Sequence, residues 1–347
     1  MASIQNQMNQ IESMESIESN ESNKRNKVES PESTPEISTE SSAASTSESS
    51  PDSTSEPVAE PVTASVDSSA ATESYMHGSI CKQLDKGQDL AVHGKYEKGY
   101  YIGVFDGHGT HKCIDILRGL DYSVIANDPL KIINWTNEWL YNSGSTMNFT
   151  TIQVEDEIIV TNYNAGDSEC IIFVNGKLVF ESVSHTLYKP GERERLIPFL
   201  NTNKPYTGGW APIPLSDKRI TVQRSDICNF KTGESIVPTM SLGHNNMTGF
   251  DPDVVTMRFK LTDHVRIISG SDGFWGMIIK SFDEDKLKTY TLEQLIDFAE
   301  ARWRQEWEYA ADNKNTNNFE KTRFPGYDDI AVSVWDNQLK QDILKTS

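Results

Sequence analysis

The first 74 residues contain no phenylalanine, tyrosine or tryptophan. They hold twenty serines and fourteen acidic residues, but only three basic ones. A segment with so few large apolar side chains buries too little surface to offset the conformational entropy that is lost on ordering. The sequence therefore predicts a disordered acidic tail rich in Ser, Glu and Pro over residues 1–74, one folded domain over 75–337 and a short C-terminal tail over 338–347.

Two interpretations of the acidic tail remain open. Segments of this composition are usually solvated extensions with no further role, and that is our default interpretation. The repeated serines next to glutamates would also suit kinases that prefer acidic surroundings, and the tail would then be a phosphorylated regulatory arm.

Cysteine is scarce and scattered. The four cysteines are Cys81, Cys113, Cys170 and Cys228, and no two of them form a CxxC pair or another close spacing. This pattern indicates neither a disulfide framework nor a thiolate zinc site. The sequence also lacks an apolar run long enough to span a bilayer and the basic-then-apolar start of a signal peptide. We therefore expect no membrane partner and an intracellular protein, cytoplasmic or nuclear and not secreted.

Positive charge is in deficit, with 32 Lys and Arg against 51 Asp and Glu and a formal net charge of −19. No stripe of basic residues suggests a phosphate backbone as a partner, so nucleic acid is not expected. Charge and length do not fix an oligomeric state, and a monomer is our expectation.

From Tyr75 onward, runs of β-forming residues alternate with turn residues. Most of these runs lie close enough along the chain to pair antiparallel. The expected strands span 100–105, 148–154, 157–163, 169–174, 254–261, 264–268 and 330–335. Residues 201–238 mix Gly, Pro and polar residues without a steady period, which predicts a long irregular excursion of the kind that is often functional.

Only a few stretches have a helical period. The clearest helix follows Thr291, which has the capping-box spacing with Gln294 and precedes apolar residues at helical intervals as far as Trp303 and Trp307. We interpret both tryptophans as core anchors. A second helix is expected from about residue 110 through 117. Sheets with segregated helices indicate an α+β fold.

Acidic residues stand at the predicted ends of three strands. Asp106 follows the strand at 100–105, Asp272 follows the strand at 264–268, and Asp328 with Asp329 precedes the last strand. A rigid scaffold can bring distant side chains together at strand ends. Hard divalent cations prefer oxygen ligands, and a pair of cations needs a bridging carboxylate. One Asp beside a Gly is usually a turn former, so the set rather than any single member indicates a metal site.

Six sequence blocks follow one another across about residues 75–337. They are KGQDLAV (86–92), GVFDGHG (103–109), SGSTMNFTTI (143–152), NAGDSECIIF (164–173), SGSDGFW (269–275) and YDDIAVSVW (327–335). In this order the blocks resemble those of the metal-dependent Ser/Thr protein phosphatase family, type 2C (PPM-type). The resemblance implies two antiparallel β-sheets packed as a sandwich and flanked by antiparallel helices, in an α-β-β-α arrangement.

The resemblance also implies two Mn²⁺ or Mg²⁺ ions at one end of the sandwich. By position, Asp106 would bridge the two ions and the carbonyl of Gly107 would contact one of them. Asp272 and Asp328 would complete the first ion's ligands, and Asp89 would support the second ion, through water.

The implied activity is the hydrolysis of phosphoserine and phosphothreonine on a phosphorylated protein substrate. A hydroxide held between the ions would attack the phosphorus in line, with Asp106 as the central ligand. His108 would be the general acid that protonates the leaving oxygen, because an imidazole titrates near neutral pH.

Some positions depart from the family pattern around the substrate. The family usually has an Arg for the substrate phosphate where this chain has Leu84, and Lys86 or Lys82 would be weaker replacements because a lysine lacks the bidentate fork. Gln88 replaces an acidic residue that often precedes the opening Asp.

Further departures concern a third ion and the rim. Gly276 replaces an Asp that commonly helps to bind a third ion, which counts against such an ion, although Asp167 of the same pair is retained. Ser184 replaces the Asp of an Asp-His block, and His244 stands where the family often has the Asp of Leu-Gly-Asp. Two hypotheses follow: an active, divergent phosphatase, which we favour, or a weak or inactive pseudophosphatase that acts as a binding or regulatory module.

Overall fold

The structure is a computed structural model, and it describes residues 76–136, 140, 142–196, 203–206, 211–223, 226–229, 234–310 and 319–338. The tails predicted at 1–74 and 338–347 lie outside the described residues, apart from residue 338. Among the helices in the described ranges, none has both the length and the apolar character that a membrane span requires.

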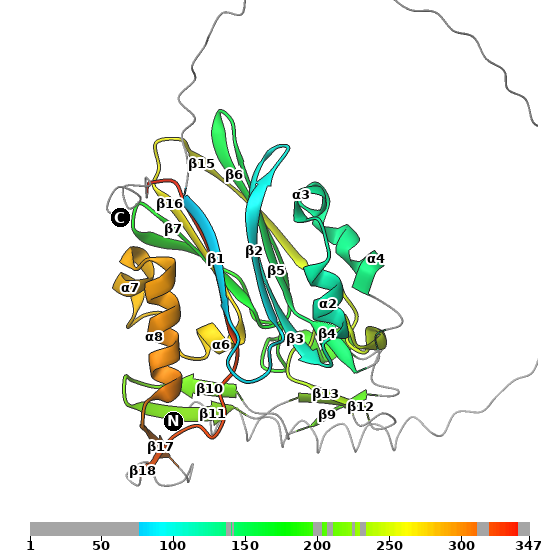
Figure 1. Cartoon of the computed structure of the whole chain (residues 1–347), viewed down its shortest axis with the longest axis vertical. Helices are drawn as coiled ribbons and strands as arrows, with labels where there is room; N and C mark the ends of the chain where they lie inside the picture. The colour runs from blue at the N-terminus through cyan, green and yellow to red at the C-terminus, as the bar shows by residue number, and fades with distance from the viewer. Residues whose placement is uncertain are drawn as a thin grey trace, which may run out of the picture. The chain divides into compact units, whose positions relative to one another are not determined.

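Two antiparallel sheets form the centre of the domain (Figure 1). The five-stranded sheet has the order β1-β19-β16-β7-β8, and it consists of β1 (Met76–Lys82), β7 (Glu169–Val174), β8 (Lys177–Glu181), β16 (Val265–Gly270) and β19 (Ile330–Asp336). The seven-stranded sheet has the order β14-β4-β3-β5-β6-β15 with β2 also paired to β3, and it consists of β2 (Asp89–Tyr96), β3 (Gly99–Gly109), β4 (Ser143–Ser145), β5 (Met147–Val154), β6 (Glu157–Ala165), β14 (Leu242–Gly243) and β15 (Asp253–Lys260). All of the strands expected from the sequence are present.

The inner faces of the two sheets bury a shared apolar cluster. Ile102 and Ile152 from the seven-stranded sheet pack with Ile172, Ile267 and Trp335 from the five-stranded sheet. Each strand places every second side chain on this inner face, so its sequence alternates between apolar and other residues. Burial of one such side chain stabilises the fold by about 1.5–3 kcal/mol. The two sheets therefore form a sandwich.

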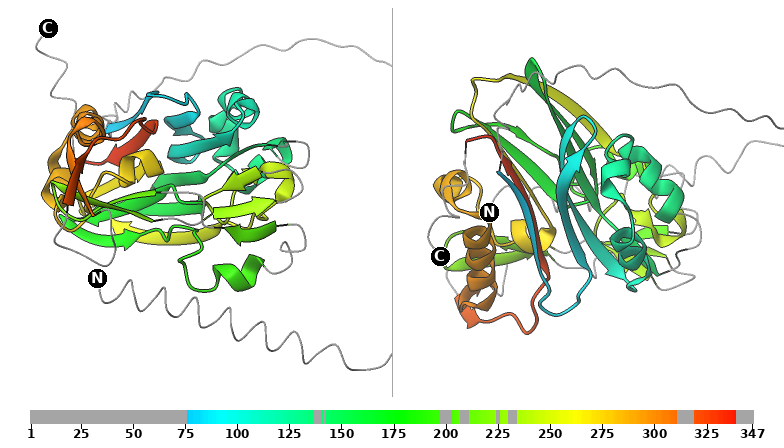
Figure 2. Two further views of the ribbon diagram at one scale, coloured as in Figure 1. Left: turned by 90° about the horizontal axis from the view of Figure 1, so that it is seen from below. Right: turned by 45° about the horizontal axis from the view of Figure 1, so that its top comes forward.

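Helices cover both outer faces of the sandwich, as Figure 2 shows. The seven-stranded sheet is covered by α2 (Lys112–Arg118), α3 (Tyr122–Ile125), η1 (Pro129–Ile132) and α4 (Ile133–Thr136). The five-stranded sheet is covered by α6 (Asp272–Trp275), α7 (Glu284–Thr289) and α8 (Leu292–Arg304). Two short helices, α5 (Glu192–Leu196) and η3 (His244–Asn246), lie in connecting segments. The α+β class with α-β-β-α layering is thus confirmed.

Helix α8 begins as predicted but ends earlier. The Thr291 hydroxyl accepts the N–H of Gln294, and the Gln294 side chain accepts the N–H of Thr291, which completes the capping box. Extended backbone at Gln305 ends the helix after Arg304, so the prediction that the helix continues to Trp307 was wrong. Trp307 instead lies in β17 (Trp307–Ala310) and is fully buried there. This segment is extended because β17 pairs with a strand on each side.

The segment at 201–238 is not irregular where the structure describes it. It contains β9 (Asn203–Tyr206), β10 (Ala211–Pro214), β11 (Arg219–Gln223), β12 (Asp226–Asn229) and β13 (Glu234–Ile236). These strands form two small sheets, β13-β12-β9 and β10-β11-β17-β18, the latter with β18 (Phe319–Thr322). The strands are short, and prolines occupy only the edge strands β9 and β10, where a missing N–H donor is tolerated. Short length and proline together hid the strand period in the sequence.

Candidate metal centre

Asp106 lies inside β3, where this strand changes its partner. β3 pairs with β5 as far as Val104 and with β4 from Gly107 onward. Between these pairings, Thr146 donates its N–H to the Asp106 carbonyl oxygen at 2.9 Å and accepts the Asp106 N–H on its hydroxyl at 3.0 Å. The strand therefore continues past Asp106 instead of ending before it, because β4 takes over the pairing. The Ser-Gly-Ser-Thr block acts by fixing the backbone of Asp106.

Asp89 is brought next to Asp106 by strand register. The two residues lie directly opposite each other in the β2–β3 pair, and both are buried. Gly107 follows, and a Cβ atom at this position would lie 2.4 Å from the Ile114 side chain and 2.5 Å from the Gln88 carbonyl oxygen. Only glycine allows the chain to pass this closely, so the Asp-Gly pair is a steric requirement of the site.

Asp272 and Asp328 approach each other through a second close contact. The Ser271 N–H donates to the Ala331 carbonyl oxygen, and the Ser271 hydroxyl accepts the Ala331 N–H, each at 3.0 Å. A Cβ atom at Gly273 would lie 1.9 Å from the Asp329 carbonyl oxygen and 3.2 Å from Asp328 Cβ. The start of α6 is thus held against the segment that precedes β19, and Asp272 lies close enough to Asp328 for that carboxylate to raise its pKa.

Asp329 organises the loop between β1 and β2. Its carboxylate is buried and accepts backbone N–H groups from Leu84 at 2.7 Å, Lys86 at 3.3 Å and Gln88 at 2.7 Å. This grip holds the chain that leads into Asp89. It also places the Lys86 ammonium group 2.7 Å from a carboxylate oxygen of Asp328. Asp329 is therefore a loop anchor, a role that the sequence did not reveal.

The metal-centre carboxylates, by which we mean Asp89, Asp106, Asp167, Asp272 and Asp328, repel one another electrostatically. Burial raises the pKa of Asp89, Asp106, Asp167 and Asp272 well above the usual value, and the neighbouring carboxylates raise it further. The carboxyl groups of Asp106 and Asp272 lie close enough for each to shift the pKa of the other. The carboxylates that gather here therefore cannot all be ionised unless a cation offsets their charge.

A hard divalent cation fits this group of side chains. One oxygen of Asp89 and one oxygen of Asp167 are buried without a hydrogen-bond partner. Buried carboxylate oxygens normally have a partner, so these two are available as ligands. The donors are carboxylate oxygens from five separate positions in the chain, and such donors suit Mg²⁺ or Mn²⁺.

His108 lies beside these carboxylates on β3. Its Nε2 atom is 3.7 Å from a carboxylate oxygen of Asp106, and the ligand atoms of Asp106, His108 and Asp167 lie within 4.8 Å of one another. Burial lowers the pKa of His108 well below the usual value, with further contributions from His244 and Lys86. A protonated imidazole in this position is thus a stronger acid than a free one.

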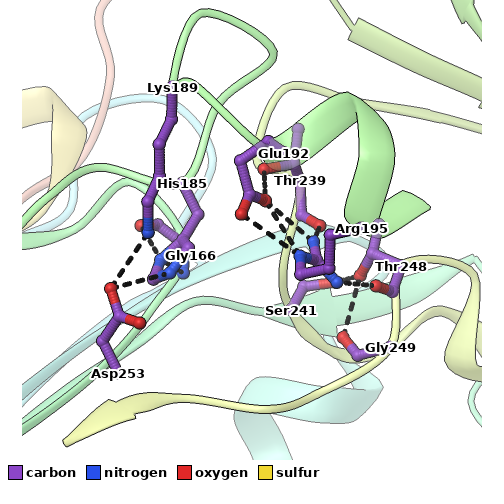
Figure 3. Close-up of polar contacts among 10 residues, drawn as sticks. All are labelled: Gly166, His185, Lys189, Glu192, Arg195, Thr239, Ser241, Thr248, Gly249 and Asp253. Carbon is purple, nitrogen blue, oxygen red and sulfur yellow. Dashed lines mark hydrogen bonds and ion pairs between the residues drawn. The ribbon is translucent and has the colours of Figure 1, made fainter.

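Asp167 is positioned by the turn between β6 and β7. Gly166 precedes it with a φ angle of +106°, a conformation that favours glycine. His185 holds this turn (Figure 3). Its ring Nδ1 atom accepts the Gly166 N–H at 3.3 Å, and its backbone N–H donates to the Gly166 carbonyl oxygen at 2.8 Å. The adjoining segment is fixed by an ion pair between Lys189 and Asp253 at 3.0 Å.

The predicted phosphate contacts separate in the structure. The Lys86 side chain is half-exposed and lies among the metal-centre carboxylates, which raise its pKa although burial alone would lower it. Lys82 points away to α8, where it pairs with Glu300 and lies 3.9 Å from Asp297. The structure therefore does not bring Lys82 to the site. Leu84, where the type 2C resemblance would place an Arg, packs against the apolar cluster under α8.

His244 is a neighbour of the site that sequence reasoning did not assign. Gly243 and the three residues after it all have positive φ angles, which turns the chain sharply beside β4. The buried His244 ring reaches 5.9 Å from the ring of His108, measured between centroids, and rests against Gly144, where a Cβ atom would lie 2.1 Å from it. The change from Leu-Gly-Asp to Leu-Gly-His was the only signal of this contact in the sequence.

No family model and no curated protein matches this chain. Among solved structures, it is similar to the PPM Ser-Thr phosphatase MsPP from Mycobacterium smegmatis in complex with cacodylate, at 15% identity and a TM-score of 0.44 over 75% of this chain and 97% of that one. It is also similar to the S. agalactiae serine/threonine phosphatase, at 16% identity and a TM-score of 0.46 over 76% and 99%. A third similarity is to serine-threonine phosphatase 2C from Toxoplasma gondii, at 13% identity and a TM-score of 0.47 over 76% and 94%. Both measures are low, so an activity for this chain has to be inferred from its own residues.

Proposed function

We propose that this chain is a metal-dependent phosphatase that hydrolyses phosphoserine and phosphothreonine on proteins. The observation that best supports the proposal is the meeting of the metal-centre carboxylates, which come from separate segments of the sequence and hold buried oxygens without a partner. A protein gains nothing in stability from such a group without a cation, since uncompensated buried charges are costly. Their order along the chain is the order that the type 2C resemblance requires.

In this proposal the residues divide into ligands and a proton donor. Asp106 would contact two Mn²⁺ or Mg²⁺ ions, the Gly107 carbonyl with Asp272 and Asp328 would hold one of them, and Asp89 would hold the other. When bound, the ions would lower the pKa of a water molecule and offset negative charge on the phosphoryl oxygens.

His108 would deliver the proton that the leaving serine or threonine oxygen needs. Its Nε2 atom lies at the edge of the carboxylate group, 3.7 Å from Asp106, and its side chain retains partial exposure at 18%. The His108 side chain is therefore not sealed from solvent. Burial and His244 lower its pKa, which makes the protonated imidazole a stronger acid but leaves a smaller fraction of it protonated near neutral pH.

Lys86 would bind the substrate phosphate in place of the family's arginine. Its side chain is 52% exposed, so it can turn from Asp328 toward a phosphate at the site. A single ammonium group gives a weaker and less oriented contact than a guanidinium fork. A high KM with a normal dependence of kcat on metal is the expected consequence.

Hydrolysis of a phosphothreonine peptide with added Mn²⁺ tests the proposal directly. Asp106→Asn should reduce kcat by more than about 100-fold, because it removes the central ligand. Asp115→Asn is the matched control, since Asp115 is exposed on α2 and forms an ion pair with Arg118 at the surface. Turnover that persists in excess chelator, or that survives Asp106→Asn, would refute a metal-dependent mechanism.

A pseudophosphatase is the second candidate, and a specific observation favours it. Lys86 already pairs with Asp328 at 2.7 Å, so an ammonium group partly meets the charge that a metal would offset. The departures at Leu84, Ser184 and Gly276 point the same way. Titration calorimetry separates the candidates, because metal binding without hydrolysis of any phosphopeptide identifies a binding module.

A further inference from the structure

A cavity of about 610 Å³ opens directly beside the metal centre. Asp167 and Asp272 line one part of it, and Glu169, Glu181 and Lys280 line another. The cavity therefore joins the proposed phosphate position to a second set of charged side chains.

The second set carries an excess of negative charge. The Lys280 ammonium group pairs with Glu169 and, at 2.5 Å, with Glu181. One positive charge thus faces two carboxylates. Glu169 is largely buried, whereas the Glu181 side chain is 45% exposed and open to a partner from solvent. Lys280 is the only basic residue that lines this cavity among the described residues.

The cavity between the two charged ends is apolar. Trp275 lies in its wall and is held in place because its indole N–H donates to the Glu169 carbonyl oxygen at 2.9 Å. The edge strand β10 contributes Pro212 and Pro214, and the half-exposed Tyr188 also lines the space. Gly276 lines the cavity at the end of α6, where a Cβ atom would lie 2.7 Å from the Asp272 carbonyl oxygen and 3.4 Å from the Pro212 ring.

We infer that this cavity binds the peptide segment adjoining the phosphoresidue and selects a lysine or arginine side chain there through Glu181 and Glu169. An apolar side chain of the same peptide would pack against Trp275. Charge complementarity supports a cationic side chain over an acidic one, because an acidic residue would add a third carboxylate beside a single ammonium group. The inference rests on the proposed function, which places the phosphate at the metal centre.

Fluorescence anisotropy with short phosphoserine peptides tests the inference. The reference peptide has alanine at every position around the phosphoserine. Each of the other peptides replaces one alanine by Arg, at a different position on either side of the phosphoserine. We expect one or two Arg positions to raise the affinity about threefold, the size of a single partly exposed ion pair. Glu at the same positions should lower the affinity.

Two variants assign the effect to the cavity. Glu181→Gln should abolish the Arg preference, and Lys280→Gln should increase it, because the first removes the excess negative charge and the second enlarges it. Glu157→Gln is the matched control, since Glu157 is an exposed strand residue that pairs with Arg258 outside the cavity. An equal affinity for all peptides, or an Arg preference that Glu181→Gln leaves unchanged, would overturn the inference.

The same peptides separate this inference from the proposed function. Arg preference in binding without any hydrolysis would refute the phosphatase activity and leave the cavity assignment standing. Hydrolysis at equal rates and affinities for the Arg and Ala peptides would support the phosphatase activity and refute the cavity assignment.

Discussion

Replacement of Asp329 by alanine should destabilise the domain by releasing the loop between β1 and β2. The buried carboxylate accepts three backbone N–H groups, those of Leu84, Lys86 and Gln88. A hydrogen bond to a charged group contributes about 1.5–3 kcal/mol, so three of them set an upper limit of about 9 kcal/mol. The true loss is smaller, because the bond to Lys86 is long at 3.3 Å and the partly exposed amides of Leu84 and Lys86 regain water.

A second effect of the same substitution opposes the first. Asp329 also adds to the repulsion that raises the pKa of Asp89, after burial, Asp328 and Asp272, so removing its charge relieves part of that repulsion. Three hydrogen bonds outweigh one distant charge, and we expect a net loss of about 3 kcal/mol for Asp329→Ala. Asp329→Asn keeps one acceptor oxygen and should lose about half as much.

Urea unfolding in excess chelator measures these losses without a contribution from bound metal. Hydrogen exchange adds a local readout, because the amides of Leu84 and Gln88 should exchange faster in Asp329→Ala while amides in α8 of the folded protein keep their rates. A variant as stable as the wild type, or unchanged exchange in the loop, would show that Asp329 does not anchor it.

Three further predictions follow from the site and the core. In chelator the protein should lose stability as pH rises above about 4, because burial and neighbouring carboxylates raise the pKa values of Asp89, Asp106, Asp167 and Asp272. Their contribution is present below the unfolded pKa of about 3.9 and is lost as pH rises through the folded values. Saturating Mn²⁺ should flatten that decline in urea unfolding, and identical slopes with and without metal would contradict the assignment. Gly273→Ala should lower the thermal midpoint strongly, since its Cβ would lie 1.9 Å from the Asp329 carbonyl oxygen, whereas Gly119→Ala, with its nearest contact at 3.4 Å, should have little effect on the midpoint. Burial raises the pKa of the Cys113 and Cys170 thiols to about 12, so iodoacetamide at pH 8 should label both only in urea; mass spectrometry that finds either labelled in the folded protein would contradict their burial.

The strands and the order of the site motifs were predictable because both are local properties of the chain. Runs of β-forming residues identified seven strands of the sandwich, namely β3, β5, β6, β7, β15, β16 and β19. The capping box located the start of α8. The end of α8 was not predictable, because Trp307 continues the helical spacing and only pairing in a sheet removes it from the helix. The short strands of 201–238 were hidden for another reason, since each has only three to five residues and prolines interrupt β9 and β10.

By itself, the sequence determined which residue types could bind a cation and where each of them stands in the chain. Tertiary structure decided which of them meet, because distances across a sandwich depend on register and on close contacts. Asp89 meets Asp106 through strand pairing, Asp272 meets Asp328 because Gly273 has no side chain, and Lys82 is drawn away by Glu300. The second carboxylate of the Asp-Asp pair, Asp329, turned out to hold the loop that leads into Asp89.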